Sequence, residues 1–252
     1  MFFWDLLKKV TCDCKDNGEH FICADRVNTI KDLLAESPYH IIYEGNLSLI
    51  FAHRDFDSEE DVLLVSSHID CVHSKCFSKE ENGMWLGTWD NSATNAAVID
   101  LMINEKFPAN TIIAFTGDEE KNSGGAMEVM RWCGENNIAP VSVIVTDTTN
   151  EGWDDEAAFT IENDKGFDIL SGFRIISKIQ ESVLPCVFVH DAEPDETWDY
   201  SKGVENIFPA TPCLSVCLPV KGDMHHDDGS LLRPESIMPY QRILTELTYL
   251  FV

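Results

Sequence analysis

Basic residues are scarce in this sequence. Its 252 residues include 18 Lys and Arg against 44 Asp and Glu, which gives a formal net charge of −26. Nucleic-acid phosphates and anionic lipids both require a positively charged face, and no cluster of Lys and Arg provides one. The composition therefore argues against a nucleic-acid partner and against docking on an anionic membrane. Most of the acidic residues are expected to serve solubility.

Long apolar runs are also lacking. No stretch approaches the roughly 18 apolar residues that cross a bilayer. The opening segment MFFWDLLKKV is apolar, but it is short for a signal sequence and Asp5 interrupts it. Nine cysteines, odd in number and irregularly spaced, are typical of reduced thiols rather than of a disulfide framework. We therefore expect a cytoplasmic protein without a membrane partner.

Internal repeats, low-complexity tracts and Pro- or Gly-rich linkers are absent as well. A chain of 252 residues, of which 44% are hydrophobic, can bury a full core. We predict one domain over residues 1–252.

Apolar segments of two kinds alternate along the chain. Helix-like patterns extend to Leu34 and return at Ser92–Ile103, Ala126–Cys133, Gly166–Glu181 and Pro234–Phe251. A hairpin is predicted between His40–Tyr43 and Leu49–Ala52. Short strand-like runs follow at Val62–Val65, Thr111–Phe115, Val141–Val145, Val187–Val189 and Cys213–Leu218, and the acidic stretch Asp191–Thr197 is predicted to be a surface loop. Strands that alternate with helices predict an α/β fold, here a three-layer αβα sandwich with a mostly parallel, mixed central sheet.

Polar residues follow four of the predicted strands at the point where each strand ends. These polar segments are Ser66–Asp70, Asp118–Glu120, Thr146–Thr148 and, shortly after the last strand, Met224–Asp227. Ligands of open α/β sheets bind beyond the carboxyl ends of the strands. Four strand ends that each carry a His or a carboxylate therefore indicate one site rather than four solvated loops.

The most acidic strand end is Asp118-Glu119-Glu120. Adjacent carboxylates repel each other, and burying one without a counter-charge is costly. Either these side chains point into water, or a cation lies near them. His68 and Asp70 lie two residues apart on an extended segment, so their side chains share a face. Asp70 can therefore accept the second ring N–H of a metal-bound His68.

The other candidate ligands each have an ordinary explanation when taken alone. Asp90 precedes a helix of small residues and could cap it. Asp147 could be an ordinary aspartate at a strand end. Taken together, one His, three carboxylates and a second His suit a hard-to-borderline divalent ion, Zn²⁺ above all.

This order of motifs resembles the superfamily of co-catalytic dinuclear zinc exopeptidases, which includes aminopeptidases, carboxypeptidases and related amidohydrolases. The matching segments span most of the chain: SSHID (66–70), GTWDNSATNAA (87–97), FTGDEE (115–120), VTDT (145–148) and MHHDDGS (224–230). The resemblance implies two Zn²⁺ ions, or other divalent ions such as Co²⁺ or Mn²⁺. It also implies a role for each matching residue: His68 binds one ion, Asp70 orients His68, Asp90 bridges both ions, Glu120 and Asp147 bind one ion each, and Glu119 is the general base.

The last ligand is ambiguous because His225 and His226 are adjacent. In the family an apolar residue often precedes this ligand, which favours His225 after Met224. The distance to the helix start at Arg233–Ile237 favours His226, and we predict His226. An acidic residue often follows four places later in the family, where this sequence has Gly229 or Ser230.

Two further expectations rest on the resemblance. Relatives with an extra domain carry it in one of two gaps, which here hold 90 − 68 = 22 and 226 − 147 = 79 residues. The first gap is too short and predicted strands and helices fill the second, so we expect the compact type without an inserted lid or dimerisation domain. In the family the peptide bond after the bridging Asp is cis, and we expect the same at Asp90-Asn91.

Cys71, His73 and Cys76 form a competing candidate, because the pattern CxHxxC could belong to a structural zinc site. It lacks a convincing fourth ligand, and it directly follows the HID segment. We expect no zinc there.

The resemblance and the ligand set together predict a metal-dependent hydrolase of peptide or amide bonds, most simply a dinuclear zinc aminopeptidase. Water between the ions would lose its proton to Glu119 and attack the substrate carbonyl. The alternatives are a deacylase of non-peptide amides on the same scaffold and a metal-binding relative without catalysis. The presence of Glu119 argues against the last. A serine nucleophile is not supported, since no GxSxG occurs.

Overall fold

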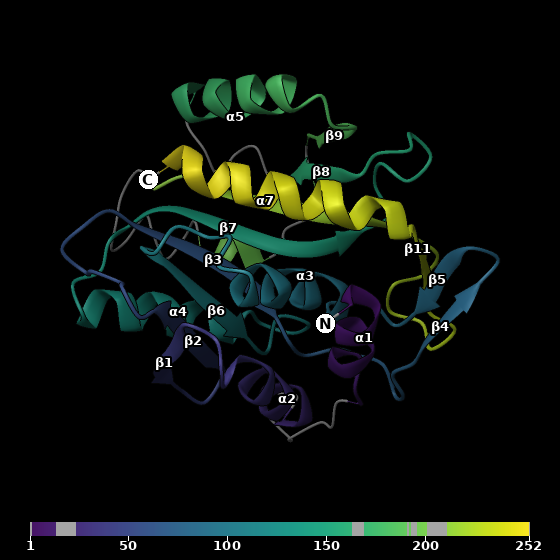
Figure 1. The fold of residues 1–252 in the computed structure, drawn as a ribbon, viewed down its shortest axis with the longest axis horizontal. Coiled ribbons are helices and arrows are strands. Elements are labelled where there is room, and N and C mark those ends of the chain that lie inside the picture. The colour runs from purple at the N-terminus through teal and green to yellow at the C-terminus, as the bar shows by residue number, and fades with distance from the viewer. Residues whose placement is uncertain are drawn as a thin grey trace.

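The structure is a computed structural model of the chain, and it describes residues 2–13, 24–162, 169–190, 192, 196–200 and 211–251. Four parallel strands form the centre of its mixed sheet (Figure 1), in the order β6 (Thr111–Thr116), β3 (Val62–His68), β7 (Pro140–Thr149) and β10 (Cys213–Lys221). Because these strands run in one direction, their carboxyl ends meet at one edge of the sheet. His68 pairs with Thr116 across one ladder, and Asp147 pairs with Cys217 across another.

Antiparallel strands extend the sheet on both sides. The predicted hairpin is present as β1 (Tyr39–Glu44) and β2 (Ser48–His53), and β2 pairs with β6. On the far side β10 pairs with β8 (Phe159–Glu162), which carries β9 (Cys186–Val189), and with β11 (Ser230–Leu232). Strand β11 also pairs with β5 (Met84–Gly87), whose other neighbour is β4 (Ser78–Glu81).

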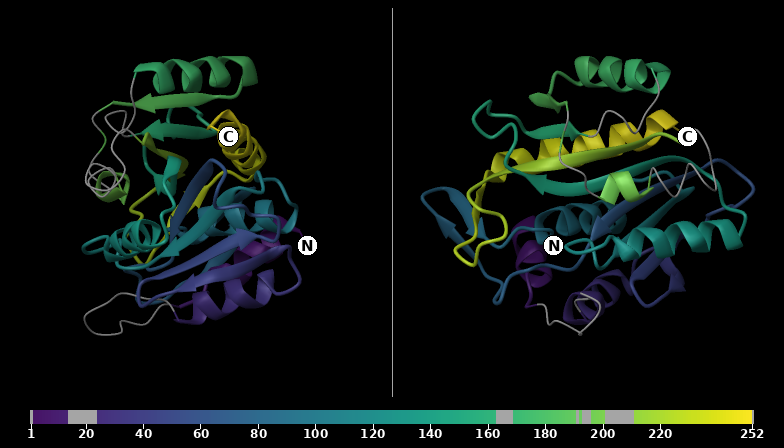
Figure 2. Two further views of the ribbon diagram at one scale, coloured as in Figure 1. Left: turned by 90° about the vertical axis from the view of Figure 1, so that its left-hand side faces the viewer. Right: turned by 180° about the vertical axis from the view of Figure 1, so that it is seen from behind.

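Helices cover both faces of this sheet (Figure 2). On one face, Leu63 and Val65 of β3 belong to a core that includes α1 (Phe3–Val10), α2 (Ala24–Leu34), α3 (Ser92–Ile103), α5 (Ile169–Ser182) and α7 (Ile237–Phe251). On the other face, Val62 and Leu64 pack with α4 (Gly124–Glu135) and with Tyr200 of a short helical segment at residues 196–200. Each such side chain contributes about 1.5–3 kcal/mol through burial. The predicted three-layer α/β sandwich with a mixed sheet is confirmed.

Helix α3 packs closest to the site. Ser92, Ala93, Ala96 and Ala97 are fully buried, and small side chains allow the helix to approach the sheet closely. Its apolar residues occur all round the helix, as expected for an element enclosed by other layers. Its first residues are therefore held firmly beside the carboxyl edge of the sheet.

Several elements differ from the sequence prediction. Strands β4, β5, β8 and β11 were not predicted, because they have three or four residues each and β4 reads Ser-Lys-Glu-Glu with no apolar alternation. The last helix begins as a 3₁₀ turn, η2 (Pro234–Ser236), before α7. The first residues of the predicted helix Gly166–Glu181 and most of the predicted loop Asp191–Thr197 lie outside the described residues.

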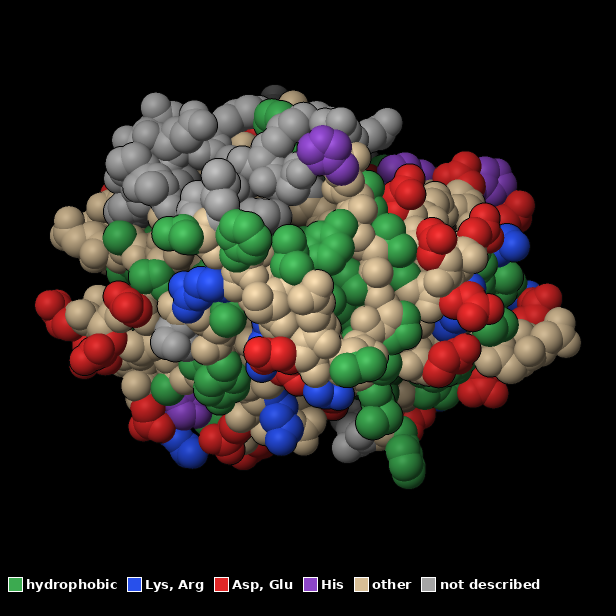
Figure 3. Space-filling view, turned by 90° about the horizontal axis from the view of Figure 1, so that it is seen from above, with side chains coloured by type: hydrophobic (Ala, Val, Ile, Leu, Met, Phe, Trp, Pro, Cys, Tyr) green, Lys and Arg blue, Asp and Glu red, His purple; other side chains and the backbone are tan. Residues whose placement is uncertain are grey.

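Helix α5 exposes several large apolar side chains. Leu170, Phe173 and Ile176 are exposed there, and hydrophobic side chains gather on the face seen in Figure 3.

Within the described ranges, no helix combines the length and the hydropathy that crossing a bilayer requires.

Candidate metal centre

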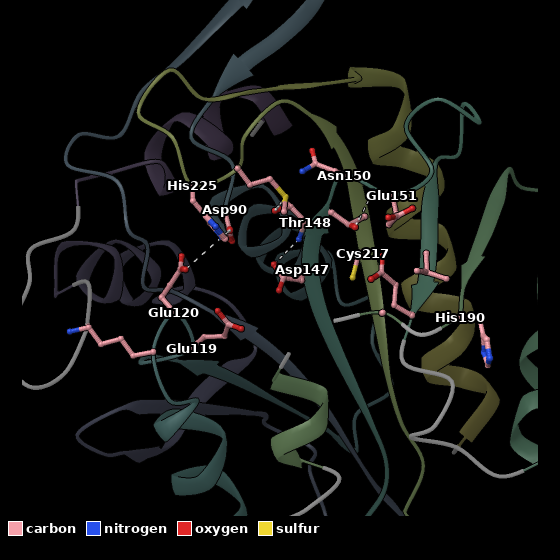
Figure 4. A pocket seen from close by; sticks show the side chains of 16 residues that line it. Asp90, Glu119, Glu120, Asp147, Thr148, Asn150, Glu151, His190, Cys217 and His225 are labelled. Atoms are coloured by element: carbon pink, nitrogen blue, oxygen red, sulfur yellow. Dashed lines mark hydrogen bonds and ion pairs between the residues drawn. The ribbon is translucent and has the colours of Figure 1, made fainter. Parts of the chain in front are cut away.

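Side chains from five segments converge at the carboxyl edge of the parallel strands (Figure 4). His68 is the last residue of β3, and Asp147 lies on the neighbouring strand β7. Glu119 and Glu120 follow β6, Asp90 immediately precedes α3, and a turn after β10 carries His225. The structure thus brings together the polar strand ends that the sequence indicated.

His68 is at the centre of the first group. Its side chain is 1% exposed, and its Nε2 atom lies 3.1 Å from Asp90 Oδ1 and 3.3 Å from Asp147 Oδ1. On the other side of the ring, Nδ1 lies 3.5 Å from Asp70 Oδ1. Asp70 therefore faces the ring nitrogen away from the cluster, where a carboxylate fixes the orientation of a ligating imidazole.

Asp90 connects this first group to a second one. While its Oδ1 faces His68, its Oδ2 lies 3.3 Å from His225 Nε2, and that nitrogen is 3.8 Å from Glu120 Oε2. Two sets of potential ligand atoms therefore share one carboxylate: His68, Asp90 and Asp147, and Asp90, Glu120 and His225. A third set, His68, Glu119 and Glu120, lies between them. A carboxylate with one oxygen in each set is the arrangement that a pair of ions requires of a bridging ligand.

His225, and not the predicted His226, faces Asp90 and Glu120. The side chain of His226 is 61% exposed, and its Nδ1 lies 3.3 Å from Asp228 Oδ2 and accepts the Asp228 N–H at 3.2 Å. The reason is local: the chain turns at this point, with His226 N–H donating to Asp223 O, so neighbouring side chains point apart. Met224 packs against the core on the inner side, which was the signal in favour of His225.

The backbone around Asp90 is held by residues that the sequence reasoning did not single out. The Asp90-Asn91 peptide bond is cis, as expected from the resemblance. Asn91 Nδ2 donates to Thr146 O at 2.8 Å, which joins this segment to β7. Asn95 Nδ2 donates to His68 O at 2.7 Å and so joins α3 to the end of β3. An amide in the first turn of a helix rich in small and apolar residues is the sequence feature that could have pointed to Asn95.

Two further polar residues near the site are buried. Arg26 is fully buried, and its guanidinium donates to the carbonyl of Ile69, between His68 and Asp70, at 2.9 Å. Asp118 is buried as well, and its backbone carbonyl accepts N–H bonds from Asn122 and Ser123 in a tight turn. It is absent from the groups of potential ligands.

Several carboxylates lie close together in this buried cluster, and their proximity shifts the pKa values of its members. Burial raises the pKa of Glu119 to about 9, and neighbouring carboxylates add to the effect while His68 opposes it. Burial and the charge of Asp90 raise the pKa of Glu120 to about 8. Contact with Asp90 is the main cause that raises the pKa of His225 to about 9. Burial would raise the pKa of Asp90 too, but its contacts with the two imidazoles outweigh burial and lower that pKa.

The donor set fits a pair of divalent cations. Asp90 Oδ1 and Glu120 Oε1 are buried, and neither accepts a well-formed hydrogen bond from any residue that the structure describes. Buried carboxylate oxygens without donors are costly unless a cation balances them. Imidazole and carboxylate ligands together suit Zn²⁺, Co²⁺ or Mn²⁺.

A cavity of about 640 Å³ opens directly over this cluster. Beyond the cluster its wall includes Thr148, Glu151, Glu162, His190 and Cys217 (Figure 4). This volume is in the range of small-ligand sites and accommodates a few amino-acid residues.

Comparison with known proteins extends the resemblance to the whole fold. No protein-family model matches the sequence, and no curated protein matches it. Among solved structures, the TET aminopeptidase of a marine sediment archaeon of the Thaumarchaeota superposes with a TM-score of 0.76 at 11% identity, over 97% of this chain and 96% of that one. The fold is that of the TET aminopeptidases.

Two other solved structures share this fold. The TET1 peptidase of Pyrococcus horikoshii, described as assembling into a tetrahedron or a large octahedral shell, has a TM-score of 0.71 at 12% identity, over 98% of this chain and 99% of that one. A Thermotoga maritima protein titled endoglucanase has a TM-score of 0.65 at 15% identity, again over 98% and 99%. At these identities the similarity establishes the fold, so the activity has to be argued from the site.

Proposed function

We propose that this chain is a metal-dependent aminopeptidase that uses two divalent ions, Zn²⁺ first among them, to remove the N-terminal residue of small peptides. The observation that carries the proposal is the shared carboxylate of Asp90, which belongs to two separate groups of potential ligands. A single-ion site would not require a carboxylate whose two oxygens face two different histidines, 3.1 and 3.3 Å away.

Each cluster residue has one role in this proposal. His68 and Asp147 would hold one ion, Glu120 and His225 would hold the other, and Asp90 would hold both. Bound there, the ions would lower the pKa of a water and polarise the substrate carbonyl. Asp70, 3.5 Å from His68 Nδ1, keeps that ring turned toward the cluster.

Glu119 is positioned to move the proton. Its Oε2 atom lies 4.0 Å from His68 Nε2, its side chain is 16% exposed, and it lines the cavity. Two cations bound beside Glu119 would favour its ionised form and so oppose the rise in pKa caused by burial and the neighbouring carboxylates. We assign it the role of general base: its carboxylate would accept the proton of the attacking water and then deliver it to the nitrogen of the leaving amine. Glu119 would thus act first as the base and then as the acid, so no second acid is needed.

The cavity wall favours a free amino terminus over a carboxyl terminus. Lys121 is the one Lys or Arg among the described residues of the wall, whereas Glu151 and Glu162 add carboxylates beyond the cluster. An acidic wall attracts an α-ammonium group and repels an α-carboxylate. A carboxypeptidase would instead need a cationic clamp for the carboxylate.

The setting of the enzyme is also a proposal. We propose that residues 1–252 act as one catalytic domain without an inserted lid or dimerisation domain, in the cytoplasm, and without a nucleic-acid or membrane partner. The net charge of −26 supports the exclusion of polyanionic partners.

Metal analysis combined with a substrate panel tests the proposal. The full chain is stripped with a chelator, reloaded with Zn²⁺, Co²⁺ or Mn²⁺, desalted and analysed for ions per chain. It is then assayed on aminoacyl anilides, on the same anilides with N-acetyl caps, on N-acyl amino acids and on a soluble cellulose. We expect two ions per chain and turnover of the uncapped anilides alone. One ion or none contradicts the two-ion site, turnover only of N-acyl substrates identifies a deacylase, and two ions without turnover identify a non-catalytic relative.

A further inference from the structure

The loop Cys71–Cys76 lies outside the ligand set but is attached to it. It begins immediately after Asp70, has no regular secondary structure, and leads to β4 at Ser78. Its start is firmly held, because Ile69 N–H donates to Thr116 O at 2.7 Å and the Ile69 carbonyl accepts the bond from Arg26. The first cysteine of the loop is therefore fixed to the segment that carries His68.

The same loop also contacts the turn that carries His225. The N–H of Ser74 donates to Asp227 Oδ1 at 2.9 Å, and the Ser74 hydroxyl donates to the other oxygen of Asp227. His73 is 3% exposed and lies against the backbone of Met224, the residue before His225. Neither ring nitrogen of His73 makes a well-formed hydrogen bond with a described residue. The loop is thus a brace between the two halves of the candidate metal centre.

Two thiols face each other inside this brace. The Sγ atoms of Cys71 and Cys76 are 3.7 Å apart, and no disulfide joins them to each other. Cys71 is buried at 2% exposure, whereas Cys76 is only half-buried, and we therefore expect a small reagent to reach Cys76 first. A disulfide has an S–S distance of about 2.05 Å, so the sulfurs have to approach by roughly 1.7 Å. We propose that Cys71 and Cys76 form a reversible disulfide that contracts this loop and weakens the ion position at His225.

Oxidation requires a partner, and we assign that role to a small-molecule disulfide such as oxidised glutathione. The thiolate of Cys76 attacks one sulfur of the reagent, which forms a mixed disulfide and releases one small thiol. The sulfur of Cys71 then attacks Cys76 Sγ, which forms the Cys71–Cys76 bond and releases the second small thiol. Two protons and two electrons leave the protein, and one reagent disulfide is reduced to two thiols.

The rate of the first step depends on the environment of Cys76. Its contact with the Cys71 thiol, followed by burial, raises the pKa of Cys76 above the ordinary range. The thiolate is the attacking form, so oxidation is slow at neutral pH and accelerates as the pH rises. The brace therefore responds to sustained oxidation rather than to brief exposure.

The effect on the site follows from the contacts at the ends of the loop. The Asp70 end is tied to β6 and to Arg26, and at the Cys76 end the N–H of Cys76 donates to Asp13 Oδ1 at 2.7 Å. Ser74, which lies between the two cysteines, is bonded to Asp227 on an exposed turn. When the loop shortens, the less firmly held turn moves, and it carries His225. We expect the Mn²⁺ affinity of the position that includes His225 to fall about tenfold or more, while the position at His68 changes little.

The test begins with thiol chemistry, which does not depend on catalysis. The reduced full chain is incubated with oxidised glutathione at pH 8, quenched with acid, alkylated and analysed by intact mass and peptide mapping. We expect two alkylation sites to disappear, no glutathione to remain bound, and the peptides containing Cys71 and Cys76 to be linked until dithiothreitol is added. The Cys76→Ser variant should form no such link, whereas Cys186→Ser, which removes a half-buried thiol on β9, should behave as wild type.

Mn²⁺ binding, followed by electron paramagnetic resonance, gives the second readout, because Mn²⁺ prefers carboxylates to thiols. Oxidised wild type should bind the second Mn²⁺ more weakly than reduced wild type, and Cys76→Ser should show no difference. A glutathione adduct that persists on Cys76, or a disulfide that leaves both Mn²⁺ affinities unchanged, overturns the inference. The effect on peptide hydrolysis rests on the proposed function. If the disulfide and the Mn²⁺ shift are found without any hydrolysis, the proposed function fails and the brace stands.

Discussion

Asp70 touches both sides of the candidate metal centre: its Oδ1 lies 3.5 Å from His68 Nδ1, and its Oδ2 accepts the backbone N–H of Glu120 at 3.2 Å. One buried carboxylate thereby sets the orientation of an imidazole and the position of the segment that carries Glu119 and Glu120. Asp70 therefore positions two segments that carry potential ligands, although it is not itself a ligand.

Replacing Asp70 should therefore weaken metal binding without removing a ligand. In Asp70→Asn the amide cannot supply the charge that stabilises the ring, so we expect divalent-ion affinity and kcat to fall about 10–100-fold. Competition with a chromophoric chelator measures the affinity. Asp118→Asn, which changes a buried acid outside the ligand groups, is the matched control. Equal affinities for Asp70→Asn and wild type would remove Asp70 from the site.

Glu119→Gln should separate binding from catalysis. The amide is nearly isosteric but accepts no proton, so we expect both ions to remain bound while kcat falls by about 10²–10⁴. The comparison needs ion stoichiometry and turnover measured on the same sample. Turnover near that of wild type, with the ions in place, would show that another group is the base.

The neighbouring histidines offer a direct comparison. His225→Ala removes the imidazole that lies 3.3 Å from Asp90 Oδ2, whereas His226→Ala removes one that is 61% exposed and faces Asp228. We expect the first variant to bind one ion per chain and the second to bind two. Metal analysis of the two variants side by side decides the matter, and loss of an ion in His226→Ala alone would reverse the assignment.

A buried acid on the opposite face of the sheet should make stability depend on pH. Glu196 accepts a hydrogen bond from Ser66 Oγ at 2.9 Å, and Ser66 in turn accepts one from the Tyr200 hydroxyl at 2.9 Å. Burial raises the pKa of Glu196 from 4.5 to about 7. At a pH between 4.5 and about 7, Glu196 has released its proton in the unfolded chain but retains it in the folded chain. The free energy of unfolding therefore falls as the pH rises through this window, by up to about 3 kcal/mol.

Glu196→Gln has no proton to release and should lack this part of the dependence. Urea unfolding of the variant and of wild type between pH 4 and 8, at one fixed metal condition, isolates the contribution of Glu196 as the difference between the two curves. Stability of the variant should exceed that of wild type at pH 8 and approach it at pH 4. Parallel curves over the whole range would mean that the acid is ionised in the folded chain.

The sequence predicted the central strands well, because burial on both faces imposes a recognisable apolar pattern. Strands such as Val62–Val65 and Thr111–Phe115 are buried on both sides, so a continuous apolar run marked each of them, and the acids at their ends marked the site. The choice between His225 and His226 could not be read in this way, because it depends on how one turn is wound. Asn95 was missed for a similar reason: its hydrogen bond to the His68 carbonyl joins residues 27 positions apart, and no local pattern encodes that contact.

The ligands of the two proposed ion positions differ in how firmly the protein holds them before an ion binds. His68 and Asp147 lie on adjacent strands joined by backbone hydrogen bonds, whereas the side chain of His225 is 58% exposed on a turn between β10 and β11. Ligands that are already fixed lose little conformational entropy on binding, and an exposed side chain loses more. We therefore expect stepwise occupancy, with the strand position filled at the lower metal concentration. Under metal scarcity the chain would persist as a singly loaded, inactive form, and its activity would follow the supply of the second ion.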